Sequence, residues 1–228
     1  MKKKVLVVVS HPDDEVIGCG GTLIKHVTNG DKVKVIFTSE SESAREKNKK
    51  LSKKKTLERQ KIAEKVSKHL KFEKPIFLNF PNLSLTRKDV TKMNSLIKDT
   101  IYKFKPDVIY THSPYDIHHD HRKTFDATLV AARPSKINKV CELLTFEIPS
   151  ASEFSIFPNS KNFNPNIFVN IEKQMQLKKK VLMFYKNQFN EYPNILSIKS
   201  ILNLSEYRGN MVNLKFAESF ELIRKINY

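Results

Sequence analysis

The stretch from Val5 to Thr22, VLVVVSHPDDEVIGCGGT, constrains the fold of this chain more than any other. A run of apolar residues ends at Ser10, a turn crowded with ionisable groups follows, and glycines then lead into a second apolar pattern. This order predicts a buried strand, a polar turn and a helix. The turn would lie at the carboxyl end of the strand, where open α/β sheets bind ligands. The imidazole and three carboxylates of residues 11–15 need a positive partner there, and a divalent metal ion is the simplest one.

Beyond this stretch, apolar patterns of strand and helix length alternate through the first 146 residues. Strands are expected at Lys4–Val9, Lys32–Thr38, Pro75–Asn79, Asp107–Thr111, Val140–Phe146 and Ile167–Ile171. Helices are expected at Val16–Asn29, Leu51–Leu70, Val90–Phe104, Thr124–Arg133, Glu172–Asn187 and Ile195–Tyr207. Such alternation favours parallel βαβ units. We therefore expect one domain over residues 1–228, of α/β class, folded as a three-layer sandwich around a mostly parallel sheet.

Three further segments are interpreted from their patterns. The helix expected at Leu51–Leu70 would bury an apolar stripe made of Leu57, Ile62, Ala63, Val66 and Leu70. Ser150–Asn166 is expected to be irregular, and Leu214–Leu222 fits a helix or a strand.

Lysine and arginine outnumber the acidic residues by 41 to 24, which gives a net charge of +17. Much of the excess lies in Arg45–Lys74, where Phe72 is the only aromatic residue, so the base-stacking pattern of single-strand binders is missing. We interpret this segment as a solvated helix face and expect no specific nucleic-acid partner. No apolar run is long enough for a membrane span, and the N-terminal one is too short for a signal peptide. The two cysteines fit a cytoplasmic protein.

A second polar cluster follows the strand expected at Asp107–Thr111. Its members are His112, Asp116, His118, His119, Asp120 and His121. Because this turn also lies at the carboxyl end of a strand, we expect it to face the turn at residues 11–15. Five of the seven histidines of the chain lie in these two turns, which favours a metal site over five separate structural histidines.

A catalytic zinc ion takes three His, Asp or Glu ligands and keeps one position open for water. The set would be His11, Asp14 and one of His118, His119 or His121. Asp13 is then a spare carboxylate beside a ligand, placed to act as the base for that water, although spacing alone leaves the two aspartates interchangeable. The glycines at positions 18, 20 and 21 do not match the G-x-G-x-x-G spacing of a nucleotide-binding loop.

The two clusters resemble the motifs of a known family. HPDDE at residues 11–15, with the glycines that follow, looks like the first motif of the PIG-L/LmbE-like N-deacetylases. DIHHDH at residues 116–121 resembles the second, and YRG at 207–209 with KFAESF at 215–220 is similar to a C-terminal signature of many bacterial members. The resemblance covers nearly the whole chain. It implies a Rossmann-like fold and the zinc-dependent removal of an N-acetyl group from an amino sugar.

The resemblance also implies roles for single residues. Carried over by position, His11, Asp14 and His121 would ligate zinc, or another divalent metal such as Fe²⁺. Asp13 would be the general base that takes a proton from the attacking water.

Further roles follow from the same resemblance. His118 would stabilise the oxyanion or protonate the leaving amine, and Asp120 would orient it. Arg59 falls near the substrate-binding arginine of the family, and Asn82 stands where many members have an aspartate. Asp116, which opens the second motif, is assigned with these two to substrate binding.

Three functions follow in order of preference. The first is a zinc-dependent deacetylase for an N-acetyl amino sugar or its conjugate, a small-molecule partner, acting as a monomer or a homo-oligomer. The second is an amidase or deacylase for another substrate, such as a thiol-cofactor precursor or an antibiotic. The third is a basic nucleic-acid-binding protein with a structural metal, against which the shortage of cysteine ligands counts.

Overall fold

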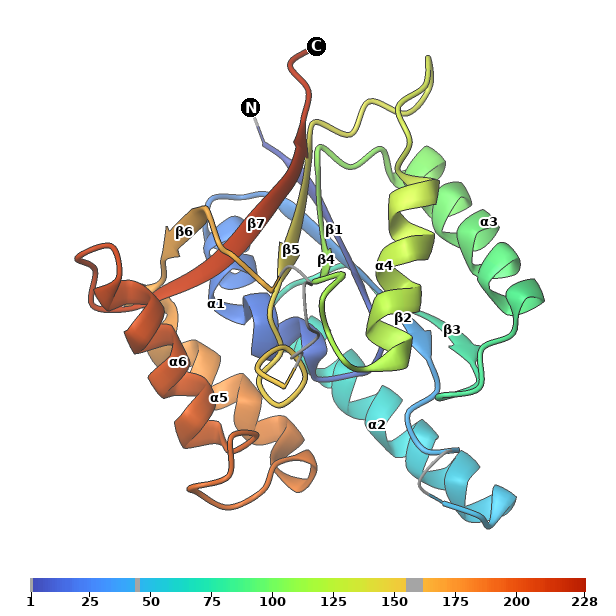
Figure 1. Cartoon of the computed structure of the whole chain (residues 1–228), viewed down its shortest axis with the longest axis horizontal. Coiled ribbons are helices and arrows are strands. Elements are labelled where there is room, and N and C mark those ends of the chain that lie inside the picture. The colour runs from blue at the N-terminus through green and yellow to red at the C-terminus, as the bar shows by residue number, and fades with distance from the viewer. Residues whose placement is uncertain (1, 44–45, 155–161) are drawn as a thin grey trace.

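The fold is built around a seven-stranded sheet in the order β3-β2-β1-β4-β5-β7-β6 (Figure 1). The computed structural model describes residues 2–43, 46–154 and 162–228. The strands are β1 (Lys4–Val9), β2 (Lys32–Ser39), β3 (Ile76–Phe80), β4 (Val108–His112), β5 (Glu142–Phe146), β6 (Ile167–Asn170) and β7 (Ala217–Lys225). β1 to β5 pair in parallel, and β7 and β6 close one side of the sheet in antiparallel fashion. The α/β class and the mostly parallel sheet expected from the sequence are confirmed.

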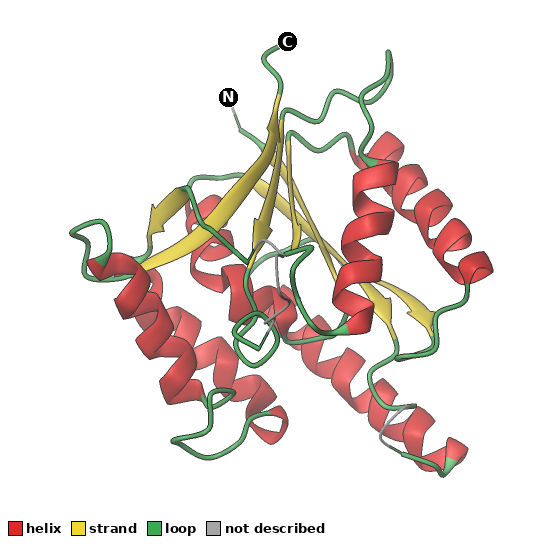
Figure 2. Cartoon of the chain, viewed as in Figure 1, coloured by secondary structure: helices red, strands yellow, loops and turns green. Residues whose placement is uncertain are grey.

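Helices cover both faces of the sheet (Figure 2). They are α1 (Asp14–Thr28), α2 (Lys49–His69), α3 (Arg87–Phe104), α4 (His119–Ala131), α5 (Met175–Leu182) and α6 (Ile198–Asn210), with short 3₁₀ segments η1 (Glu172–Gln174) and η2 (Met183–Gln188). Because successive side chains of a strand point to opposite faces, β1 contributes to two cores. Val5, Val7 and Val9 pack with α1, α2, α5 and α6, whereas Leu6 and Val8 pack with α3 and α4. These are the three expected layers.

The strand order places the two polar turns side by side. The chain leaves β1 towards β2 on one side, while β4 pairs with the other side of β1. This reversal of strand order is the position at which open α/β sheets bind ligands. Val8 of β1 is in register with Thr111 of β4, so the residues after the two strands emerge next to each other, as the sequence predicts.

Several element boundaries differ from the expected ones. α4 begins at His119 instead of Thr124, because the side chain of His118 caps it by accepting a hydrogen bond from the backbone N–H of Asp120. The segment expected as one helix at Glu172–Asn187 is divided into η1, α5 and η2. The segment 214–222, left open between helix and strand, contributes to β7. Residues 155–161 of the segment expected to be irregular lie outside the described residues.

The apolar stripe expected on α2 is wrong at one end. Leu57 is 48% exposed, whereas the buried face of this half of the helix consists of Ser52, Thr56 and Arg59. At Arg59 the buried face meets the turn after β1, where its guanidinium binds Asp13. Among the described residues, no helix is long and apolar enough to cross a membrane.

Candidate active site

The turn after β1 holds Asp13 in an unusual backbone conformation. Its φ of 126° is rare for a residue with a side chain and costs on the order of 1–3 kcal/mol, so the surroundings must enforce it. The carboxylate of Glu15 does so by accepting a hydrogen bond from the Asp13 N–H at 3.0 Å. The hydroxyl of the buried Tyr185 in turn donates to the other Glu15 oxygen at 2.9 Å. The C-terminal part of the chain therefore helps to shape this turn.

The glycines after the turn serve close packing. A Cβ atom on Gly18 would lie 2.1 Å from the ring of Phe146, and one on Gly21 would lie 2.8 Å from Ile171. Only glycine allows α1 to approach β5 and the segment before α5 so closely. The glycine motif is thus explained without a bound phosphate.

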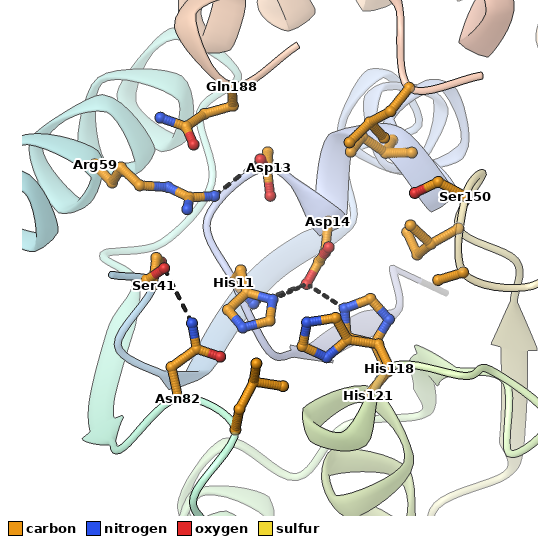
Figure 3. Close-up of a pocket in the computed structure, with 15 residues that line it drawn as sticks. His11, Asp13, Asp14, Ser41, Arg59, Asn82, His118, His121, Ser150 and Gln188 are labelled. Carbon is orange, nitrogen blue, oxygen red and sulfur yellow. Dashed lines mark hydrogen bonds and ion pairs between the residues drawn. The ribbon is translucent and has the colours of Figure 1, made fainter. Parts of the chain in front are cut away.

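Asp14 lies at the centre of a group of imidazoles (Figure 3). Its Oδ2 atom is 3.5 Å from His11 Nδ1, 3.4 Å from His112 Nε2 and 3.6 Å from His121 Nε2. These separations are long for hydrogen bonds between charged groups. They are close to the spacing of about 3.3 Å between two ligands that bind one zinc ion tetrahedrally at about 2.0–2.1 Å.

The hydrogen bonds around the imidazoles assign a free nitrogen to two of them. His121 Nδ1 lies 2.7 Å from Asp116 Oδ2 and donates to it, which leaves Nε2 facing Asp14. His11 Nε2 lies 3.2 Å from Asp120 Oδ2 and donates to it, which leaves Nδ1 facing Asp14. A histidine that ligates a metal usually donates its other ring N–H to a carboxylate or carbonyl, and His11 and His121 both have such a carboxylate partner.

His112 and His118 are held differently. Nε2 of the buried His112 accepts a hydrogen bond from the Ser10 N–H at 2.9 Å, so its lone pair is already occupied. Nδ1 of His118 accepts from the Asp120 N–H at 3.2 Å, which leaves its Nε2 as a donor. His112 was not among the residues assigned to the site from the sequence, although its position at the end of a strand carried that signal.

The pKa values divide the four histidines into the same two pairs. Burial lowers the pKa of His11, but the hydrogen bonds to Asp120 and Asp14 outweigh it and raise the pKa to about 9. The pKa of His121 is also raised, because Asp14 and Asp116 outweigh the effect of burial. Burial and the neighbouring His121 lower the pKa of His112 to about 4 and that of His118 to about 3. Positive charge is therefore favoured between His11, His121 and Asp14. Among the described residues, two groups bring ligand atoms close enough together to hold a metal ion: His11 with His118 and His121, and Asp14 with His112 and His121. Imidazole and carboxylate donors of this kind suit a divalent metal ion such as Zn²⁺.

Asp13 faces away from the imidazoles towards Arg59. Arg59 Nη2 lies 2.9 Å from Asp13 Oδ2 and 2.9 Å from the Pro12 carbonyl, while its Nη1 binds Glu42 at 3.1 Å. The guanidinium is buried, so its attraction to the Asp13 carboxylate is poorly screened by water. Arg59 was expected to bind substrate, and the structure shows it lining the cavity while holding Asp13 in place.

A cavity of about 200 Å³ opens over these groups. This volume is below the about 300–1,000 Å³ typical of pockets for drug-sized ligands, so the reacting part of a ligand must be small. Its lining residues are His11, Asp13, Asp14, Ile17, Ser41, Arg59, Asn82, Leu83, His118, His121, Ile148, Ser150, Ala151, Gln188 and Leu196. Asn82 donates to the Ser41 carbonyl at 3.1 Å, and its buried Oδ1 has no hydrogen-bond partner among the described residues. That oxygen can accept a hydrogen bond from a ligand.

Two residues assigned from the sequence lie behind the site. Asp116 has no exposed surface, does not line the cavity and binds His121, so the expected contact with substrate is not made. The carboxylate of Asp120 was expected to orient His118. It binds His11, the Ser39 hydroxyl and the Leu83 N–H instead, and only its backbone N–H reaches His118. Both differences arise because these carboxylates bind His121 and His11 through the ring nitrogens that lie away from Asp14.

Comparison with known proteins agrees with this geometry. The model of the PIG-L family, described as GlcNAc-PI de-N-acetylase, matches residues 6–132. The chain belongs to this family. The diacetylchitobiose deacetylase of Thermococcus kodakarensis is 25% identical over 97% of this chain and 83% of its own.

Solved structures share the fold at lower identity. The 4-carboxy-2-hydroxymuconate hydratase of Pseudomonas putida superposes with a TM-score of 0.77 at 20% identity, covering 100% of this chain and 98% of its own. A deacetylase of teicoplanin biosynthesis, in complex with teicoplanin, gives 0.73 at 16% identity, covering 99% and 100%. The hydratase shows that this fold alone does not determine the reaction. The family match and the relative named as a deacetylase support an N-deacetylase, an enzyme that hydrolyses N-acetyl amides.

Proposed function

We propose that this PIG-L protein removes the acetyl group from an N-acetylated amino sugar or sugar conjugate with the help of a divalent metal ion, Zn²⁺ in the first place. One observation carries the proposal. The free nitrogens of His11 and His121 converge on Asp14 at the floor of a small cavity, and the separate carboxylate of Asp13 borders the same cavity. This is a ligand set with an adjacent base.

The residues that would hold the metal are His11 through Nδ1, Asp14 through Oδ2 and His121 through Nε2. A bound Zn²⁺ would polarise the amide carbonyl and lower the pKa of water to about 7. Asp120 and Asp116 bind the opposite nitrogens, so Nδ1 of His11 and Nε2 of His121 face Asp14, where a metal ion would take the place of a proton.

Asp13 is the proton acceptor in this proposal. Its ion pair with Arg59 fixes the orientation of the carboxylate in the cavity. It takes a proton from the attacking water and passes it to the nitrogen of the departing amine, so that an amide and water yield an amine and acetate. A residue that alternates between base and acid in this way contributes about 10²–10⁴-fold to the rate.

His118 serves as a hydrogen-bond donor. Its low pKa keeps the ring neutral, and the Asp120 N–H occupies Nδ1, so Nε2 presents a proton towards the cavity. A neutral donor of this kind stabilises the negative charge that develops on the carbonyl oxygen. Of the two roles expected for His118, this one fits the geometry better than protonation of the amine.

The proposal is tested by acetate release. Protein freed of metal with a chelator is incubated with a panel of N-acetylated sugars, sugar nucleotides and sugar lipids, with and without added Zn²⁺. Release of acetate and amine that requires the metal and is lost in Asp13→Asn supports the function. Equal release of acetate with and without the metal, and in the wild type and Asp13→Asn, contradicts the function.

A second candidate differs only in the substrate. The fold neighbour solved with teicoplanin is a deacetylase that acts in antibiotic biosynthesis, and the small cavity would accept an acyl group on a larger carrier equally well. Including N-acylated glycopeptides in the panel separates the two candidates. A kcat/KM at least tenfold higher for the glycopeptides would favour the antibiotic substrate.

A further inference from the structure

Helix α1 is interrupted one turn after the candidate active site. Cys19 has φ −142° and ψ 16°, outside the helical range, so α1 consists of a short part at residues 14–18 and a longer part from Gly20 onwards. The short part begins with Asp14 and directly follows Asp13. The angle between the two parts therefore affects where both carboxylates lie.

A buried ion pair from the C-terminal part of the chain lies across this kink. Lys178 of α5 and Glu218 of β7 are 1% and 4% exposed, and their Nζ and Oε1 atoms are 2.7 Å apart. In a regular helix the N–H of Gly21 donates to the carbonyl of Ile17. Here the Gly21 N–H donates to Glu218 at 2.8 Å, and the Ile17 carbonyl accepts from Lys178 at 3.1 Å. The N–H of Thr22 also donates to Glu218, at 2.6 Å. A side chain that enters the helical hydrogen-bond ladder is a recognised cause of a kink.

One residue links the ion pair to the catalytic turn. The N–H of Ile17 donates to the carbonyl of Asp13 at 2.9 Å, and the carbonyl of Ile17 is the acceptor of Lys178. Ile17 also lines the cavity. A shift of the Lys178 ammonium is therefore transmitted through a single helical turn to Asp13.

Stability alone is a weak reason for such a pair. Burying two charges costs free energy that their attraction often fails to repay, and apolar replacements are frequently as stable. The pair nevertheless satisfies backbone groups of α1 that the kink exposes, on both sides of Cys19. Three elements contribute to this cluster, namely α5, β7 and α6, because Lys178 also lies 3.4 Å from the Ser205 hydroxyl of α6. All of them lie beyond residue 132, where the family match ends.

We propose that Lys178 and Glu218 are positioning residues, which fix the kink of α1 and thereby the placement of Asp13 and Asp14. The catalytic consequence rests on the function proposed above. The structural claim, that the ion pair holds the kink, does not depend on that function.

The test uses the double variant Lys178→Met with Glu218→Gln in the full chain. It removes both charges together, so no unpaired charge is left in the interior, and it keeps the side-chain volumes similar. Three quantities are measured: hydrogen exchange of the backbone amides in residues 17–24, the affinity for Zn²⁺, and kcat and KM for the best acetylated substrate. We expect exchange at least tenfold faster at Gly21 and Thr22, and kcat at least tenfold lower with KM changed less than threefold.

A matched control breaks an exposed ion pair between the same parts of the chain. Lys215 and Glu172 are 3.7 Å apart, with 66% and 50% of their side chains exposed. Glu172→Gln should leave hydrogen exchange, metal affinity and kcat as in the wild type. A single Glu218→Gln variant, which leaves the buried Lys178 ammonium without its carboxylate partner, should be less stable than the double variant.

The outcomes separate the parts of the proposal. Unchanged exchange at Gly21 and Thr22 in the folded double variant shows that the pair does not hold the kink, and overturns it. Faster hydrogen exchange at Gly21 and Thr22 with unchanged kcat and Zn²⁺ affinity shows that the ion pair only stabilises the helix. This result overturns the positioning role. If the wild type releases no acetate from any substrate, the proposed function fails, while exchange and Zn²⁺ affinity still test whether the pair places Asp14.

Discussion

Asp116 holds His121 by a hydrogen bond of 2.7 Å between Oδ2 and Nδ1, and has no surface exposed to solvent. The bond fixes the ring so that Nε2 faces Asp14 at 3.6 Å. Asp116 is thus a support for a proposed metal ligand, in a position where the sequence suggested a contact with substrate. Partners of this kind orient the ligand ring and raise its basicity.

Asp116→Asn should therefore lower the affinity for Zn²⁺ by about 10–100-fold, the usual effect of losing such a partner. The amide oxygen can still accept the hydrogen bond, but it lacks the negative charge that raises the pKa of His121. The affinity is measured by competition with a chelator of known strength. Asp126→Asn, at an exposed position of α4, the helix that carries His121, is the control and should leave the affinity unchanged. An equal affinity in the two variants would contradict the role of Asp116.

The roles of the two neighbouring aspartates should separate on substitution. Asp13→Asn should retain the metal and lose at least about 10²-fold in kcat, because an amide cannot take the proton from water. Its oxygen can still accept the hydrogen bond of Arg59, so the turn should keep its shape. Asp14→Asn should lose most of the metal. Elemental analysis and kcat are the two measurements, and the reverse pattern would exchange the two roles.

How far the sequence predicts this site can be judged residue by residue. The sequence predicts that the acidic turn at residues 11–15 meets the cluster at 116–121, because each follows a strand of a parallel sheet, and the pairing of β1 with β4 confirms it. The second-layer roles of Asp116 and Asp120 were not predicted. Both aspartates stand in the same motif as the histidines, and residue type does not reveal whether a carboxylate faces the cavity or the back of a ring.

The contribution of the C-terminal part could not be read from the sequence for a different reason. Tyr185, Lys178 and Glu218 reach α1 across 161 to 197 residues of chain, and no local pattern encodes such a contact. The kink at Cys19 was equally hidden, because the apolar spacing of Val16–Asn29 continues through it. Leu57 illustrates the limit of periodicity, since the buried face of α2 is polar where it covers the site.

Tyr185→Phe tests the support of the strained turn. Burial raises the pKa of Glu15 from its ordinary 4.5 to about 8, whereas the hydrogen bond from Tyr185 lowers it. Between these two pH values the folded chain holds a proton that the unfolded chain has released. The contribution of Glu15 to stability is therefore full below about pH 4.5 and is lost as the pH rises towards 8.

The variant should lose more stability at pH 9 than at pH 6. At pH 6 a neutral hydrogen bond is removed, worth about 0.5–1.5 kcal/mol, whereas at pH 9 the bond is to an ionised carboxylate and is worth about 1.5–3 kcal/mol. Denaturant unfolding at the two pH values gives the difference. Tyr192→Phe, at a residue that is 55% exposed, should show no difference between them. An equal loss for Tyr185→Phe at both pH values would contradict the interpretation of Glu15.

The basic segment Arg45–Lys74 contains the whole of α2, and the last prediction concerns its exposed lysines. The buried face of this helix is formed by Ser52, Thr56, Arg59, Ala63, Val66 and Ser67. Lys49, Lys50, Lys53 and Lys54 are exposed, as expected for a solvated helix face. Lys55 pairs with Glu46 at 3.0 Å and is left unchanged in the test.

Replacing Lys49, Lys50, Lys53 and Lys54 by glutamate should leave the fold and Zn²⁺ binding intact, because none of these side chains contributes to the core or the cavity. Turnover of a neutral acetylated sugar should change less than twofold. For an anionic sugar conjugate, kcat/KM should be lower in the variant than in the wild type. The kcat/KM of the wild type should also fall with added salt, since exposed charges are screened over about 10 Å at 0.1 M.

Nucleic-acid binding predicts a different result, in which log affinity falls linearly with log salt by about 0.9 per phosphate contacted on duplex DNA. Sub-micromolar binding to DNA at physiological salt that the charge reversal abolishes would show that this face is a nucleic-acid site.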